Sequence, residues 1–304
     1  MITKMRQVEI GSSGLRAGAL GFGCWRFTGH DLSHAETLVE TALDLGMTLI
    51  DTADIYGYGG AGFGAAEALL GRVLKADPAR RGRMVLATKG GIIPPAPYNS
   101  SRRYLIEACE ASLSRLGVEQ VDLYQIHRPD LLTSWEEVAG ALDALIADGK
   151  IRAAGISNFT VAQARALQAH FGARIASTQP EFSALHLQPV EDGTLDWCQE
   201  TGAAALAWSP LAGGRLGDGY VPQVDDPACL ADVHAALDRI ATAQGAHRSD
   251  VALAFVLMHP AQPIVLLGTQ TPARLAAARR ALDLRLSRQD WYSIVEAARG
   301  RPMP

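Results

Sequence analysis

The 304-residue sequence contains few cysteines, and their spacing is typical of neither a metal site nor a disulfide framework. The four thiols are far apart and form no Cys-x-x-Cys pair: Cys24, Cys109, Cys198 and Cys229. Structural zinc sites and small disulfide-bonded domains usually show paired cysteines at short spacing. The pattern therefore argues against both classes, predicts no metal centre, and favours a reducing compartment.

The chain also lacks a long hydrophobic run and a strong excess of either charge. The longest apolar run, 251–258, is too short to span a bilayer, and residues 1–14 contain no apolar stretch typical of a signal peptide. The formal net charge is −4, and we interpret the short basic pairs at 80–81 and 279–280 as solvated helix ends or faces. We therefore expect a cytoplasmic protein that binds neither nucleic acid nor membranes.

The sequence does contain a regular alternation of short apolar runs and segments of helical period. Helices are predicted at 36–45, 65–74, 103–116, 135–147 and 161–170, with caps within 99–101 and at Ser134. The predicted strands are 19–24, 48–53, 84–89, 121–127, 151–157, 176–181, 204–209 and 263–268.

Eight strands that alternate with helices predict parallel β-α units over roughly 250 residues, the extent of a closed (β/α)8 TIM barrel. A doubly wound open sheet is the main alternative, but it normally has fewer strands and a glycine fingerprint at its first β-α turn. No linker or change in composition divides the chain, so we expect one domain over 1–304. Residues 7–10 and 15–17 flank a Gly-Ser-Ser-Gly turn and predict an N-terminal β-hairpin that covers the lower end of the barrel.

Polar residues recur at the C-terminal ends of the predicted strands, where barrel enzymes place their catalytic groups. Taken singly, each has an ordinary structural explanation, such as a turn-forming aspartate, a packed tyrosine or a hydrogen-bonded core histidine. The residues at these ends are Asp51, Lys89, His127, Ser157, Asn158, Gln179, Trp208 and Ser209, with Tyr56 in the loop after the second strand.

Lys89 is the hardest of these residues to explain structurally. The chain has only four lysines, and this one ends an apolar strand, where an unpaired ammonium group is costly. It needs a nearby anion, and Asp51 on the adjacent strand is the obvious candidate. The ammonium would stabilise a phenolate and so lower the pKa of Tyr56, while a neutral His127 would orient a carbonyl oxygen. Together the four residues suit the reduction of a carbonyl group.

Residues 57–62 match G-x-G-x-x-G, the dinucleotide-binding fingerprint, but a match by itself is weak. These glycines follow the second predicted strand rather than the first, and that strand ends in Asp51 rather than in a glycine turn. We therefore interpret them as a flexible loop that leaves Tyr56 accessible.

Six motifs in order extend this pattern over nearly the whole chain: 20–25 (LGFGCW), 50–57 (IDTADIYG), 87–89 (ATK), 122–130 (DLYQIHRPD), 155–159 (GISNF) and 207–211 (AWSPL). Together they resemble the aldo-keto reductase superfamily. Residues 127–130 and the tail 286–299 are closer to bacterial members of unassigned substrate than to the sugar-reducing animal enzymes. The resemblance implies a TIM barrel that binds an extended nicotinamide cofactor without a Rossmann domain.

The resemblance also implies roles for individual residues. Tyr56 would be the general acid, Lys89 and Asp51 the pair that tunes it, and His127 the residue that orients the substrate. Trp208 stands where most relatives have a stacking tyrosine, and an indole offers the same flat face. The implied contacts to the nicotinamide end and the pyrophosphate are Gly23, Cys24, Trp25, Asp51, Ser157, Asn158, Gln179, Trp208, Ser209, Leu211, Gly213 and Arg215.

The residues after the eighth strand depart from the pattern of NADPH-dependent relatives. Arg274 matches the arginine that such relatives offer to the 2′-phosphate, and a guanidinium is a good phosphate ligand. No lysine accompanies it, and Ala278 stands where an amide side chain often occurs. NADPH is therefore the expected cofactor, with NADH left open. The implied contacts in this segment are Gly268, Thr269, Gln270 and Arg274.

We expect a small carbonyl or alcohol substrate, with walls of the substrate pocket formed by Trp25, Tyr58 and Arg128. The sequence names no substrate, and it leaves the oligomeric state open, a monomer included. A nucleotide-sensing or scaffold subunit is the alternative function, although such a protein has no need of all four catalytic groups. A metal-dependent barrel hydrolase would need clustered histidines and aspartates at several strand ends, which the sequence lacks.

Overall fold

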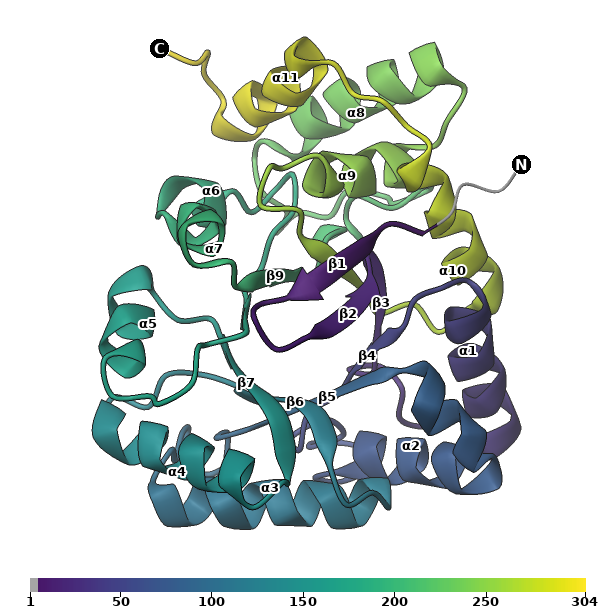
Figure 1. Ribbon diagram of the computed structural model, residues 1–304. Helices are drawn as coiled ribbons and strands as arrows, with labels where there is room; N and C mark the ends of the chain where they lie inside the picture. Colours follow the sequence, from purple (N-terminus) through teal and green to yellow (C-terminus); the bar gives the residue numbers. More distant parts are fainter. Residues whose placement is uncertain (1–4) are drawn as a thin grey trace.

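The computed structural model describes residues 5–304, and within them eight parallel strands close into a barrel (Figure 1). The barrel closes where the last strand pairs with the first, with Val265 opposite Leu20. The predicted (β/α)8 fold is confirmed. The barrel strands are β3 (Leu20–Gly23), β4 (Leu49–Asp51), β5 (Val85–Gly90), β6 (Val121–Ile126), β7 (Ile151–Ser157), β8 (Ser177–Gln179), β9 (Ala204–Ala207) and β10 (Ile264–Leu267).

Helices surround this barrel, and α1 shows how such a helix buries one face. In the first of them the buried residues Ala35, Leu38, Val39 and Ala42 recur at the three- and four-residue spacing of a single helix face. The helices are α1 (Leu32–Asp44), α2 (Ala65–Ala76), α3 (Arg102–Leu116), α4 (Trp135–Ala147), α5 (Val161–Gln168), α6 (Gln188–Glu191), α7 (Thr194–Thr201), α8 (Leu230–Gln244), α9 (Arg248–Leu257), α10 (Pro272–Ala278) and α11 (Arg288–Arg299), with 3-10 turns η1 (Pro78–Arg83), η2 (Ala212–Gly214) and η3 (Arg279–Leu282).

Two predicted caps fix where helices begin. The Ser101 side chain accepts a hydrogen bond from the backbone N–H of Tyr104 at the start of α3, and Ser134 accepts one from Glu137 at the start of α4. Each cap satisfies a backbone donor that the helix itself leaves unpaired, which stabilises the helix by about 1 kcal/mol. Both predictions are confirmed.

The central strands are buried on both faces, which explains why they read as continuous apolar runs. Every residue of β4, β5 and β6 is buried. A parallel sheet covered by helices leaves no solvent face, so the alternation of polar and apolar residues is lost. The few polar side chains within these strands must therefore find partners inside the barrel.

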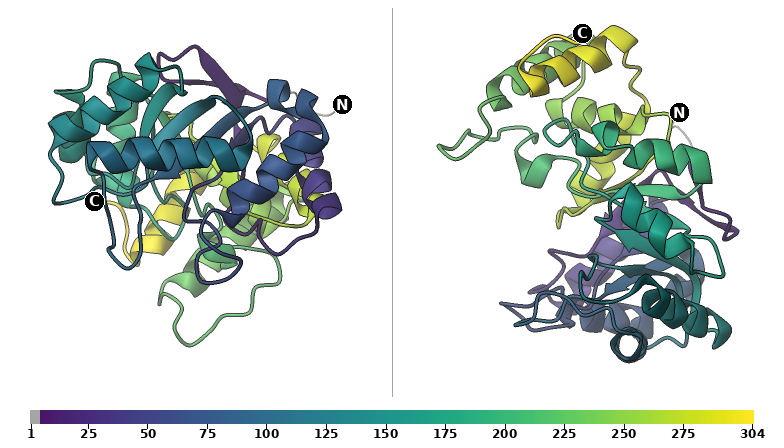
Figure 2. Two further views of the ribbon diagram at one scale, coloured as in Figure 1. Left: turned by 90° about the horizontal axis from the view of Figure 1, so that it is seen from below. Right: turned by 90° about the vertical axis from the view of Figure 1, so that its left-hand side faces the viewer.

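The hairpin of β1 (Gln7–Ile10) and β2 (Leu15–Gly18) covers the N-terminal end of the barrel, as predicted. Its turn residue Gly11 has a φ of +58°, and a Cβ there would lie 2.7 Å from the Cα of Ala176, just before β8. In the right-hand view of Figure 2 the purple hairpin and the green loop after β9 lie at opposite ends of the barrel. The C-terminal end thus stays open to ligands.

The interpretation of the two basic pairs as solvated helix ends or faces holds for the exposed Arg280 but not for Arg80, and both arginines are paired. Arg80 is largely buried and forms an ion pair with Glu40 at 3.0 Å. Arg280 forms one with the buried Asp250 at 2.8 Å. These arginines tie neighbouring helices together, and a sequence of two adjacent arginines does not reveal acidic partners that lie far away along the chain.

Within residues 5–304 no helix combines the length and the apolar character needed to cross a membrane.

Candidate active site

Residues from seven strands or strand ends meet at the open end of the barrel. Asp51 is the last residue of β4, Lys89 lies one residue before the end of β5, and His127 directly follows β6. Parallel strands bring their carboxyl ends to one face, so residues as far apart in the sequence as Asp51 and Gly268 meet there. Further polar and aromatic groups at the same face are Ser157, Gln179, Trp208 and Gly268.

Lys89 and Asp51 form a buried ion pair. The Lys89 Nζ lies 2.7 Å from Asp51 Oδ2, and neither side chain is more than 3% exposed. The same ammonium donates to the carbonyl oxygen of Thr52 at 2.8 Å. Burial alone lowers the pKa of Lys89, but the attraction of Asp51 and of the Tyr56 oxygen outweighs this effect and raises it. Lys89 is therefore a fixed positive charge at neutral pH.

Two glutamines hold the other oxygen of Asp51. Gln125 Nε2 donates to Asp51 Oδ1 at 3.1 Å, and Gln179 Nε2 donates to the same atom at 3.0 Å. All three side chains are buried. The carboxylate is thus satisfied on both sides, which fixes the orientation of the pair. Gln125 was missed by the sequence analysis, although a glutamine within the apolar run of β6 was a usable signal.

Tyr56 lies above this pair, with its hydroxyl 3.3 Å from Lys89 Nζ. Its ring meets the ring of His127 edge-on, with 5.8 Å between centroids. Burial raises the pKa of Tyr56, and the Lys89 ammonium lowers it only in part, so the net shift is upward. The expectation of a lowered pKa is therefore wrong, because it omitted the cost of removing the phenolate from water. Tyr56 keeps its proton at neutral pH.

His127 is neutral in this environment. Burial, together with the charges of Lys89 and Arg128, holds the pKa of His127 well below its ordinary range. Its Nδ1 is buried without a hydrogen-bond partner in the described part of the chain, and the residue lines the cavity described below. A neutral imidazole of this kind can hydrogen-bond a ligand oxygen without adding charge.

A chain of hydrogen bonds joins the ends of β7 and β9. Ser157 Oγ donates to the carbonyl oxygen of Gln179 at 3.0 Å, Asn158 Nδ2 donates to Ser157 Oγ at 2.8 Å, and Trp208 Nε1 donates to Asn158 Oδ1 at 3.1 Å. Asn158 and Ser209 have positive φ angles of 59° and 53°. Such a conformation is uncommon for residues other than glycine and often marks a functional site. The network fixes the plane of the Trp208 indole.

One cavity of about 980 Å³ runs along this face from Tyr56 to Arg274 in α10. Cys24 and Lys89 are buried outside its lining, Tyr58 is exposed outside it, and Arg215 instead binds Asp226 at 2.6 Å. The residues singled out from the sequence that do line it are Gly23, Trp25, Asp51, Tyr56, His127, Arg128, Ser157, Asn158, Gln179, Trp208, Ser209, Leu211, Gly213, Gly268, Thr269, Gln270 and Arg274.

The far end of this cavity contains unused polar groups. The Arg274 guanidinium is exposed and has no hydrogen bond or ion pair within residues 5–304, and Gln270 Oε1 is buried without a partner. The Asp250–Arg280 pair also lines this end, and Arg26 reaches the Gly213 carbonyl from the other wall at 3.5 Å. Sequence analysis missed these last three residues, because only the folded chain brings them to the cavity.

The glycines of residues 57–62 form turns and do not line the cavity. Gly57, Gly59 and Gly62 have positive φ angles and lie in the turn-rich segment before α2, and none of them lines the cavity. A Cβ at Gly57 would lie 2.8 Å from the Cβ of Ala65, so this position needs the small residue for packing as well as for its φ.

Among the described residues, no group of three or more histidine, cysteine, aspartate or glutamate side chains is placed to hold a metal ion.

Comparisons with known proteins agree with this geometry. The model of the aldo/keto reductase family matches residues 19–299. The chain is 48% identical over 299 residues to a 6-dehydroglucose reductase of Novosphingobium aromaticivorans, covering 97% of this chain and 96% of that protein. It is 37% identical to a protein of the same name from Agrobacterium fabrum, covering 98% and 99%.

Solved structures show the same fold over nearly the whole chain. An aldo-keto reductase of Bacillus halodurans in its holo form superimposes with a TM-score of 0.83 at 25% identity, covering 99% of this chain and 98% of that one. A thermostable aldo-keto reductase in complex with the inhibitor epalrestat gives 0.80 at 27%, covering 96% and 100%. Sequence and fold therefore agree that this chain belongs to the aldo/keto reductase family, as an oxidoreductase that reduces carbonyl compounds.

Proposed function

We propose that this protein is an NADPH-dependent reductase of aldehydes or ketones, reversible as an alcohol dehydrogenase, with Tyr56 as its general acid. The observation that carries this proposal is the position of the Tyr56 hydroxyl, 3.3 Å from a buried ammonium and at the wall of a long cavity. Family membership supports the use of a nicotinamide cofactor.

The cavity suits an extended dinucleotide. Its volume of about 980 Å³ is at the upper end for ligand sites, and the unpartnered Gln270 Oε1 and Arg274 guanidinium lie at the end opposite Tyr56. Ser157, Asn158, Gln179 and Trp208 would hold the nicotinamide, Ser209, Leu211 and Gly213 the pyrophosphate, and Arg274 the 2′-phosphate. When bound, the nicotinamide supplies a hydride to the carbonyl carbon.

The protein supplies the proton. Tyr56, which keeps its proton at neutral pH, donates it from the hydroxyl to the carbonyl oxygen and so yields the alcohol. The phenolate left behind lies next to the Lys89 ammonium, which stabilises this charge more than it stabilises the neutral tyrosine. Neutral His127 hydrogen-bonds the carbonyl oxygen and orients it. Asp51, fixed by two glutamines, keeps Lys89 in place.

We propose a sugar-derived aldehyde as the substrate class. Two relatives that share 48% and 37% of their residues with this chain are named 6-dehydroglucose reductase. The cavity wall near Tyr56 includes the partly buried Arg128, which can donate hydrogen bonds to substrate hydroxyl groups.

Tyr56→Phe tests the proposal directly. The phenyl ring keeps the packing and removes only the proton donor, so we expect kcat to fall by about 10²- to 10⁴-fold. NADPH binding, followed by fluorescence quenching, is expected to stay close to the parent value. Tyr58→Phe is the matched control, because that hydroxyl lies two residues away and outside the cavity.

Turnover of Tyr56→Phe at the parent rate contradicts the proposed mechanism. A parent protein that binds NADPH but reduces none of a panel of aldehydes would instead favour a nucleotide-sensing subunit.

A further inference from the structure

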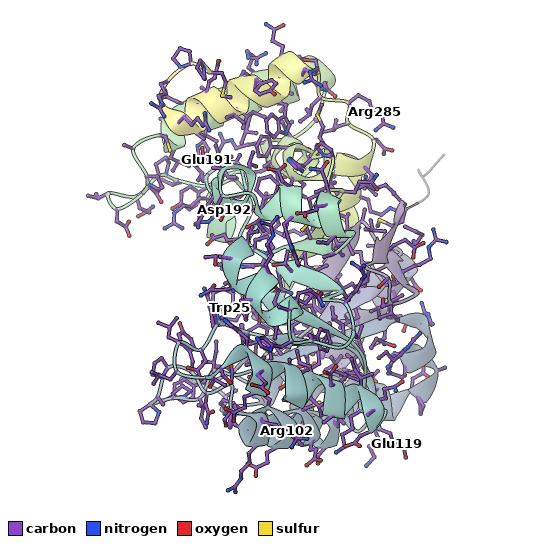
Figure 3. All side chains as sticks on the ribbon, turned by 60° about the vertical axis from the view of Figure 1, so that its left-hand side comes forward. Trp25, Arg102, Glu119, Glu191, Asp192 and Arg285 are labelled. Carbon is purple, nitrogen blue, oxygen red and sulfur yellow. The ribbon has the colours of Figure 1, made fainter. Side chains whose placement is uncertain are left out.

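A second cavity of about 310 Å³ opens beside the first, and the two share the lining residues Arg128, Asn158 and Trp208. It lies between the segments that follow β7 and β8 and the loop that precedes α7. Figure 3 labels Asp192 of this cavity and Trp25 of the first one left of centre, away from Glu119, which lies just before β6. We call it the side pocket, lined among others by Arg128, Pro180, Glu181, His186, Pro189 and Trp208.

The side pocket has a firm apolar wall. Phe159, Pro180 and Pro189 are buried, and the Trp208 indole is held by its hydrogen bond to Asn158. Prolines and a fixed indole lose little conformational freedom when a ligand binds. A wall of this kind combined with a few polar groups is the usual composition of a small-molecule site.

The polar groups of the side pocket have unused hydrogen-bonding capacity. Within residues 5–304, Arg128 forms no hydrogen bond or ion pair. Glu181 Oε2 lies 3.9 Å from His186 Nδ1, which is too long for a hydrogen bond. Glu181 and Asp192 supply acceptors, and Arg128 supplies donors. Because carboxylates outnumber the guanidinium, the pocket suits neutral hydroxyl groups better than an anion.

Arg128 lies between the side pocket and the catalytic residues. It directly follows His127, and it lines both cavities. A substrate whose carbonyl oxygen meets His127 can therefore extend past Arg128 without leaving the protein surface. The remaining part of that substrate would meet Glu181 and His186.

We infer that the side pocket is a subsite for the distal hydroxyl groups of a sugar aldehyde whose carbonyl lies at Tyr56 and His127. This inference rests on the proposed function and adds the part of the substrate that the pocket recognises. Glu181 accepts hydrogen bonds from the hydroxyl groups, and Arg128 donates to their oxygens. A short aldehyde reacts at the same carbonyl position but does not reach Glu181.

The test compares two substrates in the full-length protein with NADPH: D-glyceraldehyde, and a hexose with an aldehyde at C6. Glu181→Ala and His186→Ala are expected to lower kcat/KM for the hexose by about tenfold or more, mainly through KM, since each removes a hydrogen bond to the distal part. Turnover of glyceraldehyde is expected to stay within about twofold of the parent. Glu136→Gln, an exposed carboxylate outside both cavities, is the control.

A second measurement is inhibition of glyceraldehyde reduction by D-glucose, whose inhibition constant is expected to rise in the two side-pocket variants. If the two variants lose kcat/KM equally for both substrates, or for neither, the proposed subsite is wrong, whereas the proposed reductase activity is unaffected. Glyceraldehyde 3-phosphate serves as a third, anionic test substrate. If the two variants lose kcat/KM for this phosphate but not for the hexose, the pocket binds an anion and the assignment to hydroxyl groups is wrong. A parent that reduces neither aldehyde overturns the proposed function itself.

Discussion

The two ends of the long cavity differ in the burial and pairing of their key cationic residues, Lys89 and Arg274. At the catalytic end, Asp51 and Lys89 are buried and paired at 2.7 Å, with two glutamines fixing the carboxylate. At the other end, the Arg274 guanidinium is exposed and makes no hydrogen bond or ion pair with residues 5–304. One end is therefore organised before any ligand arrives, whereas the other keeps a charge free for a ligand.

The two arrangements have different consequences for the stability of the folded protein. A buried ion pair must be complete, because removing one partner leaves an unpaired charge away from water. An exposed guanidinium remains solvated, so it lowers the stability of the ligand-free protein very little. Substitutions in the Asp51–Lys89 pair should therefore disturb both activity and stability, whereas substitution of Arg274 should disturb only cofactor binding.

Lys89→Met is expected to have the largest effect and tests the catalytic end. It removes the charge that stabilises the phenolate, so kcat should fall by about 10²- to 10⁴-fold. It also leaves Asp51 without its counterion, so the free energy of unfolding in urea should fall by about 3–5 kcal/mol. Lys75→Met at the exposed end of α2 is the control. A Lys89 variant as stable as the parent would remove the distinction between the two ends.

Arg274→Ala tests the other end. Losing a charge-assisted hydrogen bond to a phosphate should weaken NADPH binding by about 10- to 100-fold, while NADH, which lacks the 2′-phosphate, should bind as before. Fluorescence titration with each cofactor measures both values, and Arg288→Ala, outside the cavity, is the control. Equal losses for the two cofactors would show that Arg274 does not contact the 2′-phosphate. Urea unfolding should be unchanged, in contrast to Lys89→Met.

Asp54→Asn is expected to have the smallest effect on catalysis and on cofactor binding, because Asp54 does not line the cavity, and its effect is on stability. Asp54 is buried three residues after Asp51, and neither of its carboxylate oxygens has a hydrogen-bond partner in the described chain. Burial, with help from the charge of Glu67, raises the pKa of Asp54 to about 8. Here the catalytic end contains an acidic group that stays neutral because it has no counterion.

The sign of the pH dependence follows from proton counting. Between about pH 4 and pH 8 the folded state keeps a proton on Asp54 that the unfolded state has lost, so this group lowers the stability as pH rises, by about 1.4 kcal/mol per unit. Asp54→Asn should therefore gain stability over the parent progressively through this range, with no further gain above it. Urea unfolding at several pH values measures the gain, and the exposed Asp232→Asn serves as the control. A constant difference would mean that Asp54 is ionised in the folded protein.

The fold followed from the sequence because its signals are local and repeated. Eight apolar runs separated by helical periods need a closed parallel barrel, and the caps at Ser101 and Ser134 are set by neighbouring residues. Strand ends were less accurate. The strand predicted at 48–53 spans only Leu49–Asp51, although backbone hydrogen bonds to β5 continue from Thr52 and Asp54. Apolar residues such as Ala53 continue past that point, since the loop is buried as well.

Site residues could be predicted from the sequence where their position at a strand end places them in the site. They could not be predicted where their role depends on burial among distant segments. Asp51, Lys89 and His127 end successive parallel strands, so the order of the sequence brings them together. Gln125 and the Asp250–Arg280 pair were missed, because their roles depend on which side chains from distant segments surround them.

Residue type and order were enough to predict the barrel, the face that holds the polar residues and the family to which the chain belongs. The net pKa shift of Tyr56, the burial that keeps His127 neutral and the side pocket next to Arg128 became visible only in the folded chain. The reason is physical. Residue type and spacing fix which groups reach the open end, but desolvation and cavity shape depend on atoms from many segments at once.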